Sequence, residues 1–344
     1  MMRLKRSLIL SFFLFTSAVS PEKTRAIYNS LDPSSISEHL AFYTLYPESA
    51  EGKKALSVLQ NLLGTQNISL DEPLLKDSMA ALVNLVNKPD SSQITPLNTE
   101  QLNQLERIGS KLANRSLRGK HITSEHEIFN LPIEEIDLAR ALFLSQLGDQ
   151  ALNQIRTYEV SLDMMALQIL QRIKPNSSTA EKVDAMNRYI FFDLGFRFPP
   201  HSLYAKDIDL YTFLPSVLDS RRGVCLGVSI LYITLAQRIG LNLEMITPPG
   251  HIYVRANENG QIINIETTAR GVNTPSDIYL GVDTRSLKVR NIREVIGLAH
   301  FNQASTFWNQ KKPDLAVKSY EKARPYLLDD ALLKELLGYN YLFS

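Results

Sequence analysis

A long apolar run in the second half of the chain constrains the fold most strongly. Residues 226–239 repeat leucine, valine, isoleucine and tyrosine with few polar interruptions, which predicts a helix that is buried on most sides. Gly240 ends this run, and three short strand-like runs follow at 244–247, 251–256 and 261–265. Turn residues separate the strands, so the last two are expected to form a hairpin. A buried helix followed by a small antiparallel sheet indicates an α+β domain.

Three residues with complementary chemistry occur in order along these elements. Cys225 immediately precedes the helical run, so its thiol is expected at a helix N-terminus. His251 opens the second strand, and Glu266 directly follows the third. In a hairpin, the start of one strand lies beside the end of the next. We therefore expect His251 and Glu266 to face each other.

This order of parts is that of a cysteine nucleophile with a histidine base and an acid. A thiol reacts as its thiolate, and its free pKa of about 8.5 falls near a helix N-terminus or an imidazolium. In this interpretation His251 accepts the thiol proton and later returns it to the leaving group. Glu266 holds the imidazole ring and stabilises its charged form. Backbone N–H groups at the helix start would hold a developing oxyanion.

Each of these residues also has an ordinary structural interpretation. A single cysteine in an apolar run is usually a small buried core residue, and an isolated histidine more often serves structure than catalysis. The ordered combination of thiol, imidazole and carboxylate favours catalysis more than any one of them does. The loops at 197–209 and 270–279 are expected to shape the substrate groove.

Several longer stretches carry a family resemblance. They are the segments 162–163, 191–196, 213–225, 231–241, 249–255 and 264–268. Together they resemble the transglutaminase-like cysteine superfamily, in its SirB-type branch, over roughly residues 130 to 344. The resemblance implies a papain-like α+β core with Cys225, His251 and Glu266 as a catalytic triad. The superfamily usually has aspartate where this chain has Glu266, and many SirB-type members lack the cysteine, so a non-enzymatic role is an open alternative.

Length and composition indicate several units and exclude some classes of partner. The 344 residues exceed the usual size of one domain, so two or three units are expected, and 44% apolar residues supply their cores. The net charge is +1 and no basic face is apparent, which argues against nucleic-acid binding. No spacing of ligand residues indicates a metal, and no motif indicates a nucleotide or flavin cofactor. A single cysteine cannot form an intramolecular disulfide.

The N-terminus predicts a signal peptide over residues 1–18. A basic start, Met1 to Arg6, precedes a short apolar stretch, and small residues at Thr16 and Ala18 offer a cleavage site. The apolar stretch is too short to favour a membrane-spanning helix. We therefore expect export to the periplasm or the extracellular space, with no stable membrane span after cleavage. An uncleaved N-terminal anchor is the alternative.

The rest of the chain divides by pattern. Residues 19–36 are polar and predict a linker, 37–174 predict a helical domain, 175–290 hold the cysteine core, and 291–344 predict a helical tail. The tail has the small and aromatic spacing of a tetratricopeptide helix pair in Ala316, Tyr320 and Ala323, and a second repeat begins near Tyr341. We expect this tail to pack on the cysteine core, and Ala316, Tyr320 and Tyr341 are candidate protein-binding residues.

Two functions follow from these patterns. The first is an exported Cys-His-Glu enzyme that transfers the acyl group of an amide or isopeptide bond through a thioester, by hydrolysis or by crosslinking. This chemistry needs no metal or cofactor, and its substrate would be a protein or peptide. The second is an inactive scaffold that binds a protein partner through its helical domain and repeat tail.

Overall fold

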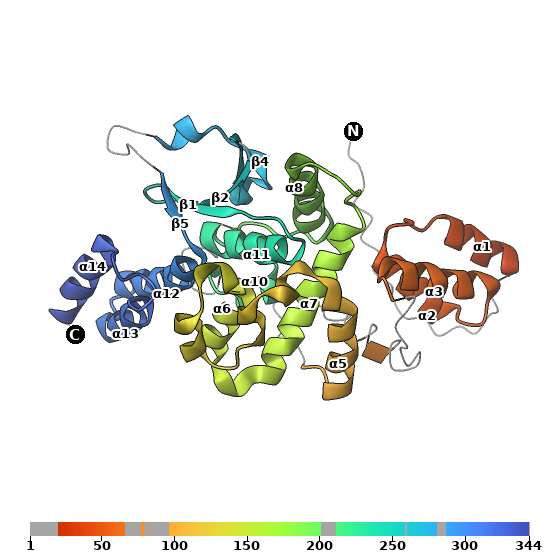
Figure 1. The fold of residues 1–344 in the computed structure, drawn as a ribbon, viewed down its shortest axis with the longest axis horizontal. Coiled ribbons are helices and arrows are strands. Elements are labelled where there is room, and N and C mark those ends of the chain that lie inside the picture. The colour runs from red at the N-terminus through yellow and green to blue at the C-terminus, as the bar shows by residue number, and fades with distance from the viewer. Residues whose placement is uncertain are drawn as a thin grey trace. The chain divides into compact units, whose positions relative to one another are not determined.

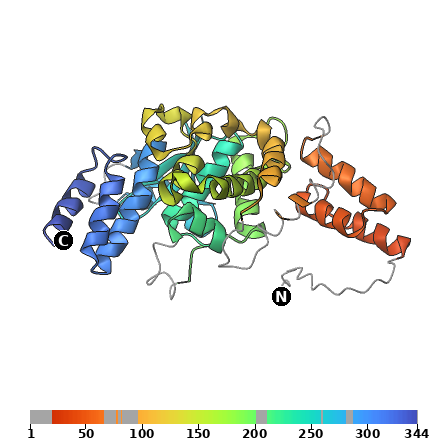
Figure 2. The same cartoon turned by 90° about the horizontal axis from the view of Figure 1, so that it is seen from below.

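The fold is described by a computed structural model that covers residues 20–65, 77, 78, 81, 96–200, 211–258, 260–280 and 287–343 (Figures 1 and 2). The predicted signal peptide, residues 1–18, and part of the predicted groove loop, 201–209, lie outside the described residues. The chain forms two compact units, Met1–Leu59 and Gln60–Ser344. The domain boundaries that we infer from the sequence remain a prediction.

The described part of the first unit is helical from its start. It contains α1 (Pro21–Asn29), α2 (Ile36–Leu45) and most of α3 (Ala50–Leu62). The helix α1 lies within residues 19–36, which we predicted to be a polar linker. The Ser20 side chain accepts a hydrogen bond from the Lys23 N–H, and a proline occupies the first turn. A capping hydroxyl with a proline just inside is a common helix start.

In the second unit, two of the described helices pack against a third, which is long and mostly buried. They are α5 (Thr99–Ile108), α6 (Leu138–Leu147) and α7 (Leu152–Leu170). Every residue of α7 from Thr157 to Ile169 is buried. The stretch between α5 and α6, which we expected to be α-helical, instead folds as short 3₁₀ helices. They are η1 (Gly109–Lys111), η2 (Ala113–Ser116), η3 (Arg118–His121), η4 (Glu125–Asn130) and η5 (Ile133–Glu135).

A second layer of helices carries the cysteine. It comprises α8 (Thr179–Asn187), a π-helical turn η7 (Arg188–Asp193), α10 (Leu214–Ser220) and α11 (Cys225–Arg238). The helix α11 packs against α7 on one side and against the sheet through β2 on another, as Figure 1 shows. The predicted helix at 226–239 therefore exists and starts one residue earlier.

The sheet is small and antiparallel, as the sequence predicted. In the described residues its strands are β1 (Glu244–Thr247), β2 (Tyr253–Glu258), β3 (Gln261–Glu266), β4 (Val272–Asn273) and β5 (Lys288–Arg290), in the order β4-β3-β2-β1-β5. The hairpin of β2 and β3 pairs Val254 with Ile265. Mostly helical units with one small antiparallel sheet confirm the α+β class.

The C-terminal tail consists of α12 (Ile292–Asn309), α13 (Pro313–Ala323) and α14 (Ala331–Tyr341), which lie side by side in blue in Figure 2. The rings of Phe301 and Tyr320 meet edge to face, with centroids 5.5 Å apart, between α12 and α13. The helix α12 packs against α6 and α11, so this tail lies on the helices of the cysteine core. Its likeness to tetratricopeptide repeats remains a prediction.

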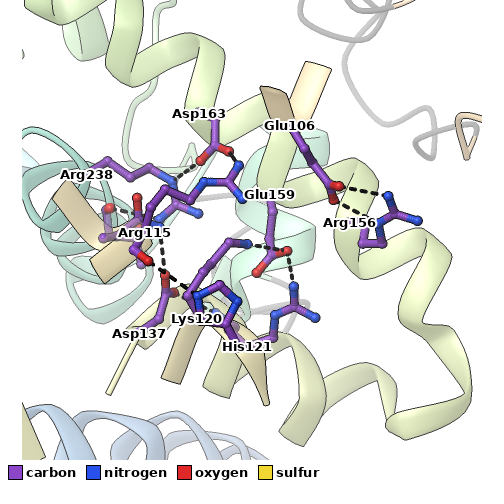
Figure 3. Close-up of polar contacts among 12 residues, drawn as sticks. Glu106, Arg115, Lys120, His121, Asp137, Arg156, Glu159, Asp163 and Arg238 are labelled. Carbon is purple, nitrogen blue, oxygen red and sulfur yellow. Dashed lines mark hydrogen bonds and ion pairs between the residues drawn. The ribbon is translucent and has the colours of Figure 1, made fainter. Parts of the chain in front are cut away.

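A buried cluster of charged side chains holds the C-terminal end of α11 (Figure 3). Arg238 is fully buried, and its Nε donates to Asp163 Oδ1 of α7 at 2.9 Å. Arg115 of η2 pairs with the other oxygen of Asp163. Burial acts to lower the pKa of Arg238, but Asp163 and the neighbouring acids raise it overall. Arg238 therefore stays charged and ties α11 to α7.

The same cluster fixes the 3₁₀ segment. Lys120 Nζ and Arg140 Nη2 approach Glu159 Oε2 at 2.6 and 2.7 Å. Asp137, at the N-cap of α6, accepts from Asn114 Nδ2 at 2.7 Å and from the backbone N–H of Arg140. The cap explains why α6 starts at Leu138, because the Asp137 side chain accepts from the Arg140 N–H in the first turn of the helix. Among the described helices, none is long and apolar enough to cross a membrane.

Candidate active site

Cys225 is more exposed to solvent than most residues of its helix. The helix α11 is described in full, and all its residues are buried except Cys225 and Gln237. Gln237 makes backbone hydrogen bonds, since its amide accepts from the Leu138 N–H and donates to the Ile136 carbonyl. Cys225 is partly exposed although Val224 and Leu226 beside it are buried. A core cysteine of an apolar helix would share the burial of its neighbours.

Two glycines and a backbone bond fix the start of α11. The Val224 N–H donates to the Tyr211 carbonyl at 2.9 Å. A Cβ atom at Gly227 would lie 2.2 Å from that same carbonyl oxygen, and one at Gly223 would lie 2.9 Å from the backbone nitrogen of Val228. Only glycine fits at these contacts. The thiol is therefore presented from a helix end whose backbone is locked by close packing.

The hairpin brings His251 and Glu266 together. His251 lies two residues before β2, and Glu266 is the last residue of β3. The β2–β3 register places these two positions at the same end of the hairpin. His251 Nε2 lies 2.6 Å from Glu266 Oε2. The two side chains therefore make the contact that the sequence predicted, within hydrogen-bond distance.

Glu266 is held by three residues. Its Oε1 accepts from the Thr268 N–H at 3.1 Å and from the Thr268 hydroxyl at 2.5 Å. Its Oε2 accepts from the Tyr279 hydroxyl at 2.6 Å, in addition to the contact with His251. Burial acts to raise the pKa of Glu266, but the hydrogen bonds from His251, Thr268 and Tyr279 lower it to about 2. Glu266 is therefore a carboxylate at neutral pH.

His251 connects the carboxylate to the thiol. The interaction with the Cys225 thiol, together with the contact with Glu266, raises the pKa of His251 to about 10, although partial burial opposes this. Because Nε2 is directed at Glu266, Nδ1 is the ring nitrogen left for the sulfur. The structure thus brings thiol, imidazole and carboxylate together, with the imidazole hydrogen-bonded to the carboxylate. Their catalytic roles remain a prediction.

A second set of contacts attaches the acid to the cysteine helix. The hydroxyls of Ser229 on α11 and Thr267 lie 3.0 Å apart, and both residues are buried. Asn187 of α8 accepts from the Tyr232 hydroxyl of α11 at 2.9 Å and donates to the Gly271 carbonyl at 3.1 Å. The segment that follows Glu266 is therefore bonded both to α11 and to α8.

Sequence reasoning missed Tyr279, Thr268 and Ser229 as members of the site. Tyr279 lies in η10 (Ser276–Tyr279), inside the loop that we expected to shape the groove. Its ring stacks on His251, with centroids 5.7 Å apart and planes 15° apart. Thr268 lies in the segment 264–268 that carries the family resemblance. Its position two residues after Glu266 could therefore have indicated it as a partner of that carboxylate. No local pattern marked Tyr279.

The candidate protein-binding residues of the tail differ in exposure. Ala316 and Tyr320 are fully buried within the tail, so they have no surface to offer a partner. This corrects part of our expectation, because the small and aromatic spacing here serves helix packing. Tyr341 is 49% exposed. Protein binding at Tyr341 remains a prediction.

In the part of the chain that the structure describes, no three His, Cys, Asp or Glu side chains gather in a way that could hold a metal ion.

Comparison with known proteins gives one match. Residues 156–283 match the family model described as the transglutaminase-like superfamily. No curated protein and no solved structure matches the chain. The matched range begins in α7 and contains Cys225, His251, Glu266 and Tyr279. The chain therefore contains a transglutaminase-like domain at residues 156–283.

Proposed function

We propose that the protein is a cysteine acyl-transfer enzyme with Cys225 as nucleophile, His251 as general acid and base, and Glu266 as the acid that orients His251. The observation that carries this proposal is the partial exposure of Cys225 at the start of a largely buried helix, beside a hydrogen-bonded His251–Glu266 pair. A transglutaminase-like domain over these residues supports the same chemistry.

The chemistry proceeds in two halves. His251 takes the proton of Cys225, and the thiolate attacks the carbonyl carbon of an amide to form a C–S bond. The imidazolium then gives its proton to the leaving nitrogen as the C–N bond breaks, which leaves a thioester. In the second half His251 takes a proton from water or from an amine, which attacks the thioester and releases the thiol. Water gives hydrolysis and an amine gives a crosslink.

Glu266 acts through His251 in both halves. Its negative charge stabilises the imidazolium that forms each time His251 holds a proton. Its contact at Nε2 leaves Nδ1 free to exchange the proton with the sulfur side. We propose a protein or peptide as the substrate, because its amide or isopeptide bonds offer the carbonyl carbons that the thiolate would attack. The predicted export signal and SirB-type affiliation belong to the same proposal.

A second function is favoured by the tail. Several large apolar side chains in α14 and just after it are exposed. They are Leu332, Tyr339, Tyr341, Leu342 and Phe343. Clusters of exposed apolar residues often mark protein interaction sites. The protein would then be a scaffold that binds a protein partner, with or without catalysis.

Substitution of the thiol separates the two functions. Cys225→Ser changes one atom and should cost about 1 kcal/mol of folding stability. If Cys225 is the nucleophile, turnover in a screen of peptide amides and isopeptides should fall by several orders of magnitude, since a serine hydroxyl forms no comparable nucleophile here. If the serine variant retains the full biological activity of the wild type, the scaffold function holds and catalysis by Cys225 is refuted.

A further inference from the structure

The two oxygens of Glu266 have different partners. Oε1 is held by Thr268 alone, through its N–H at 3.1 Å and its hydroxyl at 2.5 Å. Oε2 is shared between His251 Nε2 and the Tyr279 hydroxyl, each at 2.6 Å. Thr268 therefore holds the carboxylate through the oxygen that His251 and Tyr279 do not use. The Tyr279 hydroxyl and His251 Nε2 share the other oxygen.

Several contacts place the Tyr279 hydroxyl firmly. Its ring stacks between His251 and Tyr253, and the Tyr253 centroid lies 4.5 Å away with planes 17° apart. The start of η10 is bonded to β3, because Asn264 Nδ2 donates to the Thr274 carbonyl at 2.7 Å and to Ser276 Oγ at 2.9 Å. The hydroxyl is therefore built into the site.

The hydrogen bond from Tyr279 depends on the charge of its neighbour. When His251 is neutral, the Glu266 carboxylate carries an uncompensated negative charge and accepts strongly from Tyr279. When His251 is an imidazolium, part of that charge is compensated, so the same hydrogen bond is weaker. The Tyr279 hydroxyl therefore stabilises the state with neutral His251 more than the state with protonated His251. Its effect opposes that of Glu266.

We infer that Tyr279 is a positioning residue of this site, whose hydroxyl shares Glu266 Oε2 with His251 and thereby eases the release of the His251 proton to the leaving group. The inference rests on the proposed function. A general acid works best when it gives up its proton near the working pH, and Cys225 together with Glu266 holds that proton strongly. Tyr279 moderates this hold without displacing the carboxylate.

Among the described residues, the groups that interact with His251 come from three elements. They are Cys225 of α11, Glu266 of β3 and Tyr279 of η10. Tyr253 of β2 stacks on the Tyr279 ring. Arg255 lies behind this stack, with its guanidinium carbon 5.8 Å from the Tyr253 ring centroid and its Nη2 bonded to the Tyr253 hydroxyl at 2.8 Å. Tyr253 is thus also a stacked tyrosine, but its hydroxyl is hydrogen-bonded to Arg255 and not to Glu266.

This difference supplies a matched pair of variants. Tyr279→Phe keeps the stacked ring and removes the donor to Glu266, whereas Tyr253→Phe keeps the ring and removes an acceptor for Arg255. The measurement is the NMR titration of the His251 imidazole nitrogens in the full-length protein. We expect Tyr279→Phe to raise the pKa of His251 by about 1, and Tyr253→Phe to leave it unchanged. An unchanged or lowered His251 pKa in Tyr279→Phe overturns the inference.

A second substitution covers the case in which Tyr279→Phe does not fold. Site-specific 3-fluorotyrosine at position 279 keeps the hydroxyl and the ring and makes the hydroxyl a stronger donor. It should lower the pKa of His251, which is the opposite direction, and a rise would overturn the inference. The titration requires no turnover. If wild-type Cys225 shows no enhanced reactivity, the proposed function fails, while the titration still decides whether Tyr279 modulates the His251–Glu266 pair.

Discussion

The Ser229 hydroxyl on the cysteine helix lies 3.0 Å from the hydroxyl of Thr267, the residue next to Glu266. Ser229 is one helical turn from Cys225, so this buried contact joins the helix of the thiol to the strand end of the acid. The relative placement of nucleophile and acid therefore depends on a direct hydrogen bond between their two elements and not only on the packing of helix on sheet.

Substitution of Ser229 and of Thr267 should destabilise the fold, and the two effects should not be additive. Ser229→Ala leaves the Thr267 hydroxyl buried without its partner, so we expect a loss of about 1 to 2 kcal/mol of unfolding free energy. Thr267→Val should cost a similar amount. The double variant should lose less than the sum of the two, by about 1 kcal/mol. Urea denaturation of the four proteins measures this, and strictly additive losses would refute the coupling.

The buried Arg238–Asp163 ion pair at the other end of α11 should contribute far more to folding stability than the partly exposed Arg156–Glu106 pair nearby. Arg238→Met leaves Asp163 buried with only Arg115 as a partner, and such losses cost about 3 to 5 kcal/mol. Arg156→Met removes a partly exposed pair with Glu106 and should cost about 1 kcal/mol or less. Figure 3 shows both pairs. Equal losses in chemical denaturation would contradict the assigned role of Arg238.

His300 should make the protein sensitive to mild acid. It is buried where α12 meets α6, and its Nε2 lies 2.5 Å from Ser145 Oγ. Burial, aided by Lys322, lowers the pKa of His300 from 6.5 to about 4. The unfolded chain therefore binds a proton before the folded one does. The stability associated with a neutral His300 is present above about pH 6.5 and is lost as the pH falls to about 4.

The size of this effect follows from the two pKa values. Their difference corresponds to about 3 kcal/mol of unfolding free energy when the loss is complete. His300→Gln carries no titrating group, so its unfolding free energy should fall less over this range than that of the wild type. The measurement is urea denaturation at several pH values. Parallel pH dependence in the two proteins would show that His300 does not titrate as described.

Much of the core was predictable because its signals are local. The strand at 244–247 agrees with β1 at both ends, and α11 starts and ends one residue before the helix predicted at 226–239. The extended backbone of Val224 lets the helix begin at Cys225 itself. The order of Cys225, His251 and Glu266 along a helix and a hairpin was enough to expect the last two in contact.

Features that depend on distant contacts were missed. Leu112, Leu117 and Ile122 lie in the stretch that we expected to be helical, yet each has an extended backbone that ends a 3₁₀ turn. Buried acids contributed by α6 and α7 bond to side chains of this segment, and no local propensity encodes them. Tyr279 was missed for the same reason, because the bonds from Asn264 set the path of its loop.

The central claim is that Cys225 is an activated nucleophile, and the rate of its alkylation tests this most directly. Cys225 is the single cysteine of the chain, so incorporation of iodoacetamide reports on one site. At about pH 6 the folded protein should react at least about tenfold faster than free cysteine. His251→Ala should abolish this excess, whereas His126→Ala, at an exposed histidine outside the site, should retain it. Reaction no faster than free cysteine, or a rate that His251→Ala leaves unchanged, would contradict the claim.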